Sequence, residues 1–159
     1  MSAIADPPPL QTEFVFEARV AVDAPQLIGQ SAHGLRRVIP IKGGEVSGPA
    51  LKGRVLPGGA DWQYVRPDGV LELLAKYTIQ ADDGALILVE NRGIRSGSPE
   101  VMARLAKGEA VDVKEYYSRT TPSFEAPLGG KHEWLNRTIF VANAERLPDG
   151  VIVSFYKVK

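Results

Sequence analysis

Glycine and proline recur at short intervals along this chain, and their spacing most constrains its fold. The 159 residues include 16 glycines and 12 prolines, which disfavour long helices. The stretches between them have strand length and are rich in apolar, β-branched and aromatic residues. These stretches are Glu13–Val22, Leu35–Ile41, Leu51–Leu56, Asp61–Val65, Val70–Gln80, Ala85–Arg92, Glu115–Glu125, Leu135–Glu145 and Val151–Val158. With turn triplets such as Pro67-Asp68-Gly69 between them, they predict an all-β antiparallel sandwich or barrel.

One segment, "SPEVMARLAKG", predicts a single helix of about ten residues. Ser98 suits the N-cap, Pro99 the first helical position, and Gly108 follows a basic last turn. The apolar face consists of Val101, Met102 and Leu105. We expect this face to cover one end of the sheet, as a packing element in preference to a mobile lid.

Composition limits the partners and the compartment. Nineteen basic and nineteen acidic residues give a net charge of zero, so the protein has no overall electrostatic attraction for nucleic acid or for an anionic membrane surface. No apolar run reaches the roughly 18 residues of a spanning helix. Cysteine is absent, which excludes disulfides and thiolate chemistry and favours the cytoplasm. Residues 1–12, with three consecutive prolines and no secretory pattern, predict a flexible leader before a single domain over residues 13–159.

Alternation of polar and apolar residues indicates which strand faces are buried. In Val70–Gln80 the odd positions are mostly apolar, which predicts a half-buried strand with its odd face inward. Ala85–Arg92 is apolar on both faces until Glu90 and Asn91, so we expect it to be covered on both sides. A two- or four-residue hairpin loop would turn Glu90 and Arg92 inward, whereas a three-residue loop would turn Asn91 inward. The sequence leaves both registers open.

Several motifs together resemble one known family. They are "FVFEARVAV", "HGLRRVIPIKGGEVSGP", "PGGADWQ", "ENRG", "YYSRTTPSFE" and "WLNRTIFVANAERLPDGV", in this order between Glu13 and Val158. They resemble the domain of unknown function 3237 family of uncharacterised bacterial and fungal proteins. The resemblance implies an antiparallel β-barrel, lipocalin-like or allene-oxide-cyclase-like, with an interior cavity and no assigned activity. We expect the chain to differ from its relatives mainly between Gly93 and Tyr116, the segment that holds the predicted helix.

Asp61 is the first candidate catalytic residue. If it faces the cavity, desolvation raises its pKa and makes it a general acid or base. Alternatively, it accepts backbone N–H groups in the tight Gly58-Gly59 turn. Trp62 lies on the opposite strand face and is a candidate stacking wall for a substrate.

Arg119 and Glu90 are the other candidate catalytic residues. Arg119 suits a carboxylate, enolate or carbonyl oxygen, but a cross-strand ion pair with Glu90 or Glu125 is the structural alternative. Glu90 would be a second carboxylate beside Asp61, or would simply neutralise Arg92. The candidate substrate-binding residues, besides Trp62, are Asn91, Tyr117, Thr121, Trp134 and Asn136. Trp134 is equally explained as core.

Patterns for cofactors are missing from the sequence. The two histidines, His33 and His132, lie beside glycines and have no further ligands at ordered spacing, so no metal is predicted. No dinucleotide, phosphate-loop or nucleophile-elbow pattern occurs. We therefore expect no cofactor and a small-molecule ligand as the partner.

Three functional hypotheses remain at this level. The leading one is a cofactor-free enzyme that performs isomerisation, cyclisation, or hydration and elimination on a small carbonyl or aromatic compound. The alternative is a non-catalytic lipocalin-like carrier or sensor. The third is a purely structural homodimer, which fails if the barrel holds a cavity of a few hundred Å³, the usual scale of a ligand site.

Overall fold

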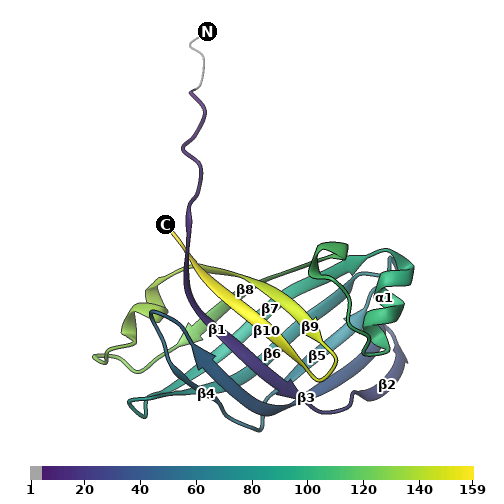
Figure 1. Cartoon of the computed structure of the whole chain (residues 1–159), viewed down its shortest axis with the longest axis horizontal. Coiled ribbons are helices and arrows are strands. Elements are labelled where there is room, and N and C mark those ends of the chain that lie inside the picture. Colours follow the sequence, from purple (N-terminus) through teal and green to yellow (C-terminus); the bar gives the residue numbers. More distant parts are fainter. Residues whose placement is uncertain (1–4) are drawn as a thin grey trace.

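A computed structural model describes residues 5–159 and shows a closed antiparallel β-barrel with one α-helix (Figure 1). The strands are β1 (Thr12–Val22), β2 (Gln26–Ser31), β3 (Gly34–Ser47), β4 (Gly53–Val55), β5 (Ala60–Val65), β6 (Leu71–Ala81), β7 (Leu86–Gly97), β8 (Tyr116–Glu125), β9 (Phe140–Leu147) and β10 (Gly150–Val158). The helical elements are α1 (Pro99–Ala106) and two 3₁₀ turns, η1 (Val113–Glu115) and η2 (Glu133–Arg137).

The barrel closes because β1 pairs with both β10 and β3. The ring runs β1, β10, β9, β8, β7, β6, then β4 and β5 in one shared position, and returns through β3. β2 pairs with β3 outside this ring. Nine of the ten strands thus make a barrel of eight positions, and the all-β barrel prediction is confirmed.

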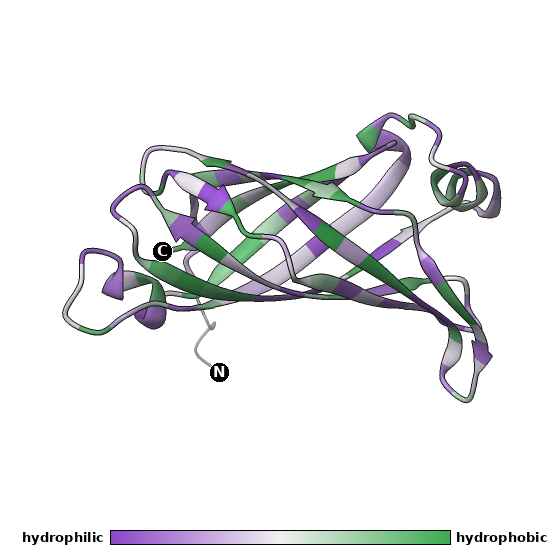
Figure 2. Cartoon of the chain, turned by 90° about the horizontal axis from the view of Figure 1, so that it is seen from below, coloured by the Kyte–Doolittle hydropathy of each residue, from purple (hydrophilic) through white to green (hydrophobic). Residues whose placement is uncertain are grey.

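Side chains alternate between the interior and the outer surface, as the burial patterns of β6 and β8 show. Hydrophobic and hydrophilic residues accordingly both occur along the strands in Figure 2. In β6 the odd positions, including Leu71, Tyr77 and Ile79, are buried, as their pattern predicted. β7 differs from its prediction, because Leu86 and Leu88 remain 52% and 44% exposed on the outer surface. The strand is therefore covered on its inner face only.

The hairpin between β6 and β7 has the three-residue loop 82–84, since Ala81 and Ala85 are hydrogen-bonded to each other. This loop is the alternative that turns Asn91 inward, and Asn91 is buried. Glu90 and Arg92 accordingly point outward. Turn geometry has selected between the two registers that the sequence left open.

The two ends of the barrel differ. Four phenylalanines, Phe16, Phe124, Phe140 and Phe155, pack into one cluster with ring centres 4.6 to 5.7 Å apart. Leu135 and Trp134 of η2 pack against this cluster, so the η2 end of the interior is filled. α1 lies at the opposite end (Figure 1).

The helix begins and ends close to the positions that the sequence predicts. The Ser98 side chain accepts a hydrogen bond from the Val101 N–H at 3.2 Å, and Gly108 adopts a positive φ of 79° just beyond the last turn. Leu105 is buried with Val111 and Tyr116. At eight residues, α1 is not a helix that could cross a membrane, and residues 5–159 contain no helix that could.

Two segments depart from the sequence expectation. Residues Gln26–Ser31 form β2, although no strand was predicted there. Residues 133–137 form η2, where the pattern had predicted the start of a strand at Leu135. The strand starts at Phe140 instead. Trp134 and Asn136 therefore do not share a strand face.

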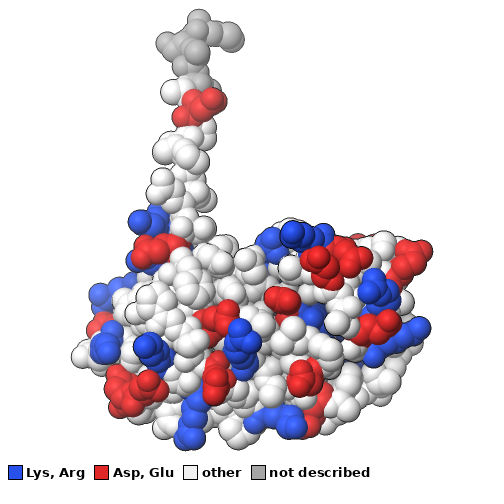
Figure 3. Space-filling model, viewed as in Figure 1, with Lys and Arg blue, Asp and Glu red and all other residues white. Residues whose placement is uncertain are grey.

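The outer surface carries both signs of charge, and on the face in Figure 3 lysines and arginines are interspersed with acidic side chains. Many of them pair, for example Lys76 with Glu90 at 3.0 Å. Residues 5–11 are exposed and lie in no strand, and the chain enters the barrel at Thr12 (Figure 1). Residues 1–4 of the predicted leader lie outside the described residues.

The aromatic cluster predicts a large local contribution to stability. Replacement Phe124→Ala removes a side chain that touches three other rings, so we expect a loss of about 3–5 kcal/mol in the free energy of unfolding. Leu88→Ala, on the exposed outer face, is the control and should change it by less than about 1 kcal/mol. Chemical denaturation of both variants checks this. Equal losses of unfolding free energy in the two variants would contradict the conclusion that the η2 end of the barrel is filled.

Candidate functional site

A cavity of about 80 Å³ lies inside the barrel next to α1. Leu105 and Ala106 of α1 line it, together with aliphatic residues of the neighbouring strands such as Val20, Ile39 and Val153. The volume is smaller than the few hundred Å³ expected of a ligand site, and holds roughly a handful of water molecules. A cavity of a few hundred Å³ would have excluded a purely structural role, and this cavity is smaller than that.

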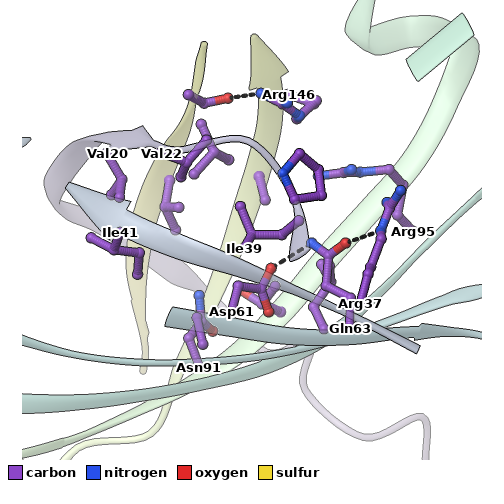
Figure 4. A pocket seen from close by; sticks show the side chains of 18 of the residues that line it. Val20, Val22, Arg37, Ile39, Ile41, Asp61, Gln63, Asn91, Arg95 and Arg146 are labelled. Atoms are coloured by element: carbon purple, nitrogen blue, oxygen red, sulfur yellow. Dashed lines mark hydrogen bonds between the residues drawn. The ribbon is translucent and has the colours of Figure 1, made fainter. Parts of the chain in front are cut away.

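Asp61 of β5 lies on the wall of this cavity (Figure 4). Its carboxylate accepts two hydrogen bonds, one from the Leu74 N–H of β6 at 3.0 Å and one from the Gln63 side-chain amide at 2.6 Å. The backbone donor is Leu74 of the neighbouring strand, and not the Gly58-Gly59 turn that the structural alternative invokes. Burial raises the pKa of Asp61 above its ordinary value, against the lowering effect of these two hydrogen bonds.

A short chain of side chains fixes the orientation of Asp61. Arg37 of β3 donates from Nε to the Gln63 Oε1 at 2.8 Å, and Gln63 in turn donates to Asp61. Because a guanidinium only donates, the amide oxygen of Gln63 must face Arg37 and its NH₂ must face the carboxylate. Asp61 is therefore held as the acceptor at the end of the chain.

Other polar groups meet at the same cavity without partners. The Asn91 Oδ1, Tyr77 Oη, Thr120 Oγ1 and Arg95 Nε are buried and have no hydrogen-bond partner within residues 5–159. Buried polar atoms are normally satisfied, and a cluster of unsatisfied ones beside a cavity is typical of a site for water or a ligand.

The strand register brings these groups together. Ala75 of β6 pairs with Asp61 on one side and with Asn91 on the other, so both polar residues flank one small side chain. Next along β7, Gly93 lies opposite Thr120. A Cβ at Gly93 would stand 2.4 Å from the Thr120 Cγ2 and 2.3 Å from the Arg119 carbonyl oxygen, so only glycine fits there.

Five of the predicted site residues lie on the outer surface of the barrel, away from the cavity. Trp62 is 39% exposed and Tyr117 51% exposed, both on the outer surface. Arg119 and Thr121 share that face of β8 with Tyr117, and the Arg119 guanidinium lies 5.3 Å from the Tyr117 ring centre. Glu90 is paired with Lys76 and Arg92 at 3.0 and 2.9 Å. These residues point outward because side chains alternate along a strand, and the neighbours of each of these residues point inward.

Trp134 and Asn136 lie in η2 at the filled end, away from α1. The Trp134 ring packs 5.8 Å from Phe140, as the core alternative expected. The Asn136 amide makes two hydrogen bonds with the Ala126 backbone, at 2.7 and 2.9 Å. Asp61 and Asn91 are thus the predicted site residues that the structure brings together.

Sequence reasoning missed several polar cavity residues, among them Tyr77, Arg95, Thr120 and Arg146. A signal existed for the first three. Tyr77 belongs to the inward odd face of β6, Arg95 has the parity of Asn91, and Thr120 alternates with Arg119. Knowledge of the pairing register between neighbouring strands would have identified these three residues as inward-facing.

The structure contains no group of three or more metal-ligating side chains within residues 5–159. His132 is buried at the filled end, and its Nε2 lies 2.9 Å from the Asp83 carboxylate. This pair ties the β6–β7 hairpin to the loop before η2.

The raised pKa of Asp61 predicts a specific pH dependence of stability. The carboxyl is neutral in both states below its ordinary pKa of 3.8, and as pH rises the folded state must ionise it at a cost. The stabilisation of wild type relative to Asp61→Asn should therefore be largest in acid and fall as pH rises through the raised pKa. Denaturation of both proteins from acid to neutral pH measures it, and a rise with pH would contradict the burial argument.

Comparison with known proteins places these features in a family. An uncharacterised UPF0311 protein of Clostridium acetobutylicum is 49% identical over 147 residues, which cover 92% of this chain and 92% of that protein. The crystal structure of a conserved protein of unknown function from Rhodopseudomonas palustris has a TM-score of 0.92 at 42% identity and covers 96% of this chain and 100% of that one.

A fungal protein is more distantly similar. A hydroalkoxylation enzyme of Penicillium herquei is 34% identical over 83 residues, covering 52% of this chain and 55% of that protein. The crystal structure of an enzyme from the same fungus shares the fold, with a TM-score of 0.73 at 21% identity. The family described as protein of unknown function (DUF3237) matches residues 10–158, and the chain belongs to this family.

Proposed function

We propose that this barrel is an acid–base catalyst in which Asp61 transfers a proton to or from a small carbonyl or aromatic compound held in the cavity. One observation carries the proposal: a carboxyl group with a raised pKa lies on the cavity wall among buried polar atoms that have no partner. A carboxyl whose pKa moves toward neutrality is a more effective proton donor and acceptor at physiological pH.

The surrounding groups suit the other roles in such a reaction. The Asn91 amide and the Thr120 hydroxyl can hydrogen-bond a carbonyl or hydroxyl oxygen of the compound, which stabilises charge that develops there. Gln63 and the Leu74 N–H fix the carboxylate of Asp61, so that little reorientation is needed for proton transfer. Isomerisation, cyclisation, and hydration or elimination all require proton transfers of this kind to accompany the bonds that form or break at carbon, and side chains can perform these transfers without a cofactor.

The similarity to the fungal hydroalkoxylation enzyme supports this class of chemistry. Hydroalkoxylation adds an alcohol O–H across a carbon–carbon double bond, so one proton reaches carbon and one leaves oxygen. A single carboxyl can serve both transfers, first as acid and then as base. Only about half of each chain is matched, so the argument extends to the reaction class and not to the substrate.

A non-catalytic carrier is the second candidate. The aliphatic part of the cavity wall and the cover provided by α1 suit retention of an apolar ligand. Such a protein would bind the same compounds without converting them.

Ligand screening followed by one substitution separates these functions. We first expect phenols, lactones or keto acids to raise the melting temperature of the purified protein, because a ligand bound by the folded state alone stabilises it. Asp61→Asn should lower the turnover of such a compound by about 100-fold or more while binding is retained. Assays of product formation by chromatography measure the loss.

Asp68→Asn is the matched control, since Asp68 is an exposed carboxylate paired with Arg66 in the turn before β6. It should turn over the compound at the wild-type rate. Full activity of Asp61→Asn would overturn the catalytic role, and binding without turnover in the wild type would favour the carrier.

A further inference from the structure

Arg95 is a charged cavity group to which the proposed function gives no role. It lies on the inner face of β7, between Leu71 of β6 and Ser118 of β8, and is 5% exposed. Its Nε is buried without a partner, and no hydrogen bond or ion pair within residues 5–159 involves its guanidinium. The side chain lines the cavity beside Gln63 and Arg37 (Figure 4).

A buried guanidinium without an anion is costly to fold. Removing an ion from water costs several kcal/mol in real proteins unless a partner compensates. Burial lowers the pKa of Arg95 to about 10, and the nearby Tyr116 and Asp61 side chains, which raise it, offset this only in part. A site that keeps such a charge has either a structural or a functional use for it, and no structural partner is present among the described residues.

The other charges around the cavity have neutral partners. Arg37 donates to the Gln63 amide oxygen, and Arg146 donates to the backbone carbonyls of Leu147 and Gly150, the latter at 2.7 Å. Asp61 accepts its hydrogen bonds from an amide and a backbone N–H. With three arginines and one carboxylate, the cavity lining carries a net charge of +2 when Asp61 is ionised.

We propose that the ligand of this cavity is a small organic carboxylate whose carboxylate group pairs with the guanidinium of Arg95. A carboxylate matches the planar fork of a guanidinium with two parallel hydrogen bonds, and Nε is one of the donors that such a pair uses. The anion would also neutralise part of the excess positive charge of the lining.

The rest of the lining sets the size and character of the acid. Apart from Tyr77, the apolar wall is aliphatic, with Ile39, Val20 and Leu105 among its members. The cavity of about 80 Å³ suits a small acid of roughly the size of acetate or pyruvate. This inference names the substrate class of the proposed acid–base site and so rests on that function, but the binding it predicts does not require turnover.

Pairs of acids and neutral amides test the charge requirement on the wild-type protein. The probes are acetate against acetamide, and pyruvate against pyruvamide, with affinities measured by calorimetry. We expect each acid to bind at least about ten-fold more tightly than its amide, because the amide forgoes a charge-assisted pair. Amides that bind as tightly as the acids would overturn the inference.

Substitutions test whether the preference for the acid over the amide depends on Arg95. In Arg95→Gln the acid-over-amide preference should fall to about two-fold or less, whereas Arg92→Gln, which removes an exposed arginine from the outer face of the same strand, should retain it. Without ligand, Arg95→Gln should melt no lower than wild type, since it removes an unpaired buried charge. Retention of the preference in Arg95→Gln would assign the anion to another group and contradict the proposal.

Asp61→Asn separates this inference from the proposed function. It removes the negative charge of the lining, so acids should bind about ten-fold more tightly to it than to wild type. If acids bind in this way but none is converted by wild type, the carboxylate site stands and the catalytic proposal fails. If a neutral compound is converted with dependence on Asp61 while acids do not bind, the catalytic proposal stands and the carboxylate inference fails.

Discussion

The pairing of β1 with both β3 and β10 is the interaction on which the rest of the structure depends, because it turns a sheet into a barrel. Once the ring is closed, every second side chain points into a volume that water reaches only at the ends. An inward polar residue then has to find a partner inside, bind something, or remain unsatisfied. The chemistry of this protein follows from which polar residues have inward parity.

The interior is divided along the barrel axis. Four phenylalanines and η2 fill one end, whereas small and β-branched side chains leave space beneath α1 at the other. The polar inward residues belong to this second end, where Asp61, Asn91 and Arg95 come from strands that neighbour one another around β6. The filled end supplies stability through apolar burial, and that allows the other end to keep groups that do not stabilise the fold.

Electrostatics makes the second end unusual. Burial disfavours ionisation of Asp61 and of Arg95 alike, so the pKa of the acid rises and that of the base falls. The two groups lie on the same cavity but hydrogen-bond neutral partners or none, instead of forming an ion pair. A direct pair would satisfy both charges and leave neither available. Keeping them apart leaves a proton-transfer group and a cationic group facing one space, and the acid–base proposal and the carboxylate proposal rest on this separation.

The sequence by itself determined the fold class, most strand positions and the helix, because turn residues and strand or helix periodicity are local properties of the chain. It also singled out Asp61 and Asn91. It could not orient β5, β7 and β8, since the side that faces inward is set by register across strands, and a shift of one residue exchanges the faces. That is why Trp62, Glu90 and Arg119 had been assigned to the site while Tyr77, Arg95 and Thr120 had not. Only the closed barrel, through the three-residue loop at 82–84 and the pairings of β6, decided which side chains meet in the cavity.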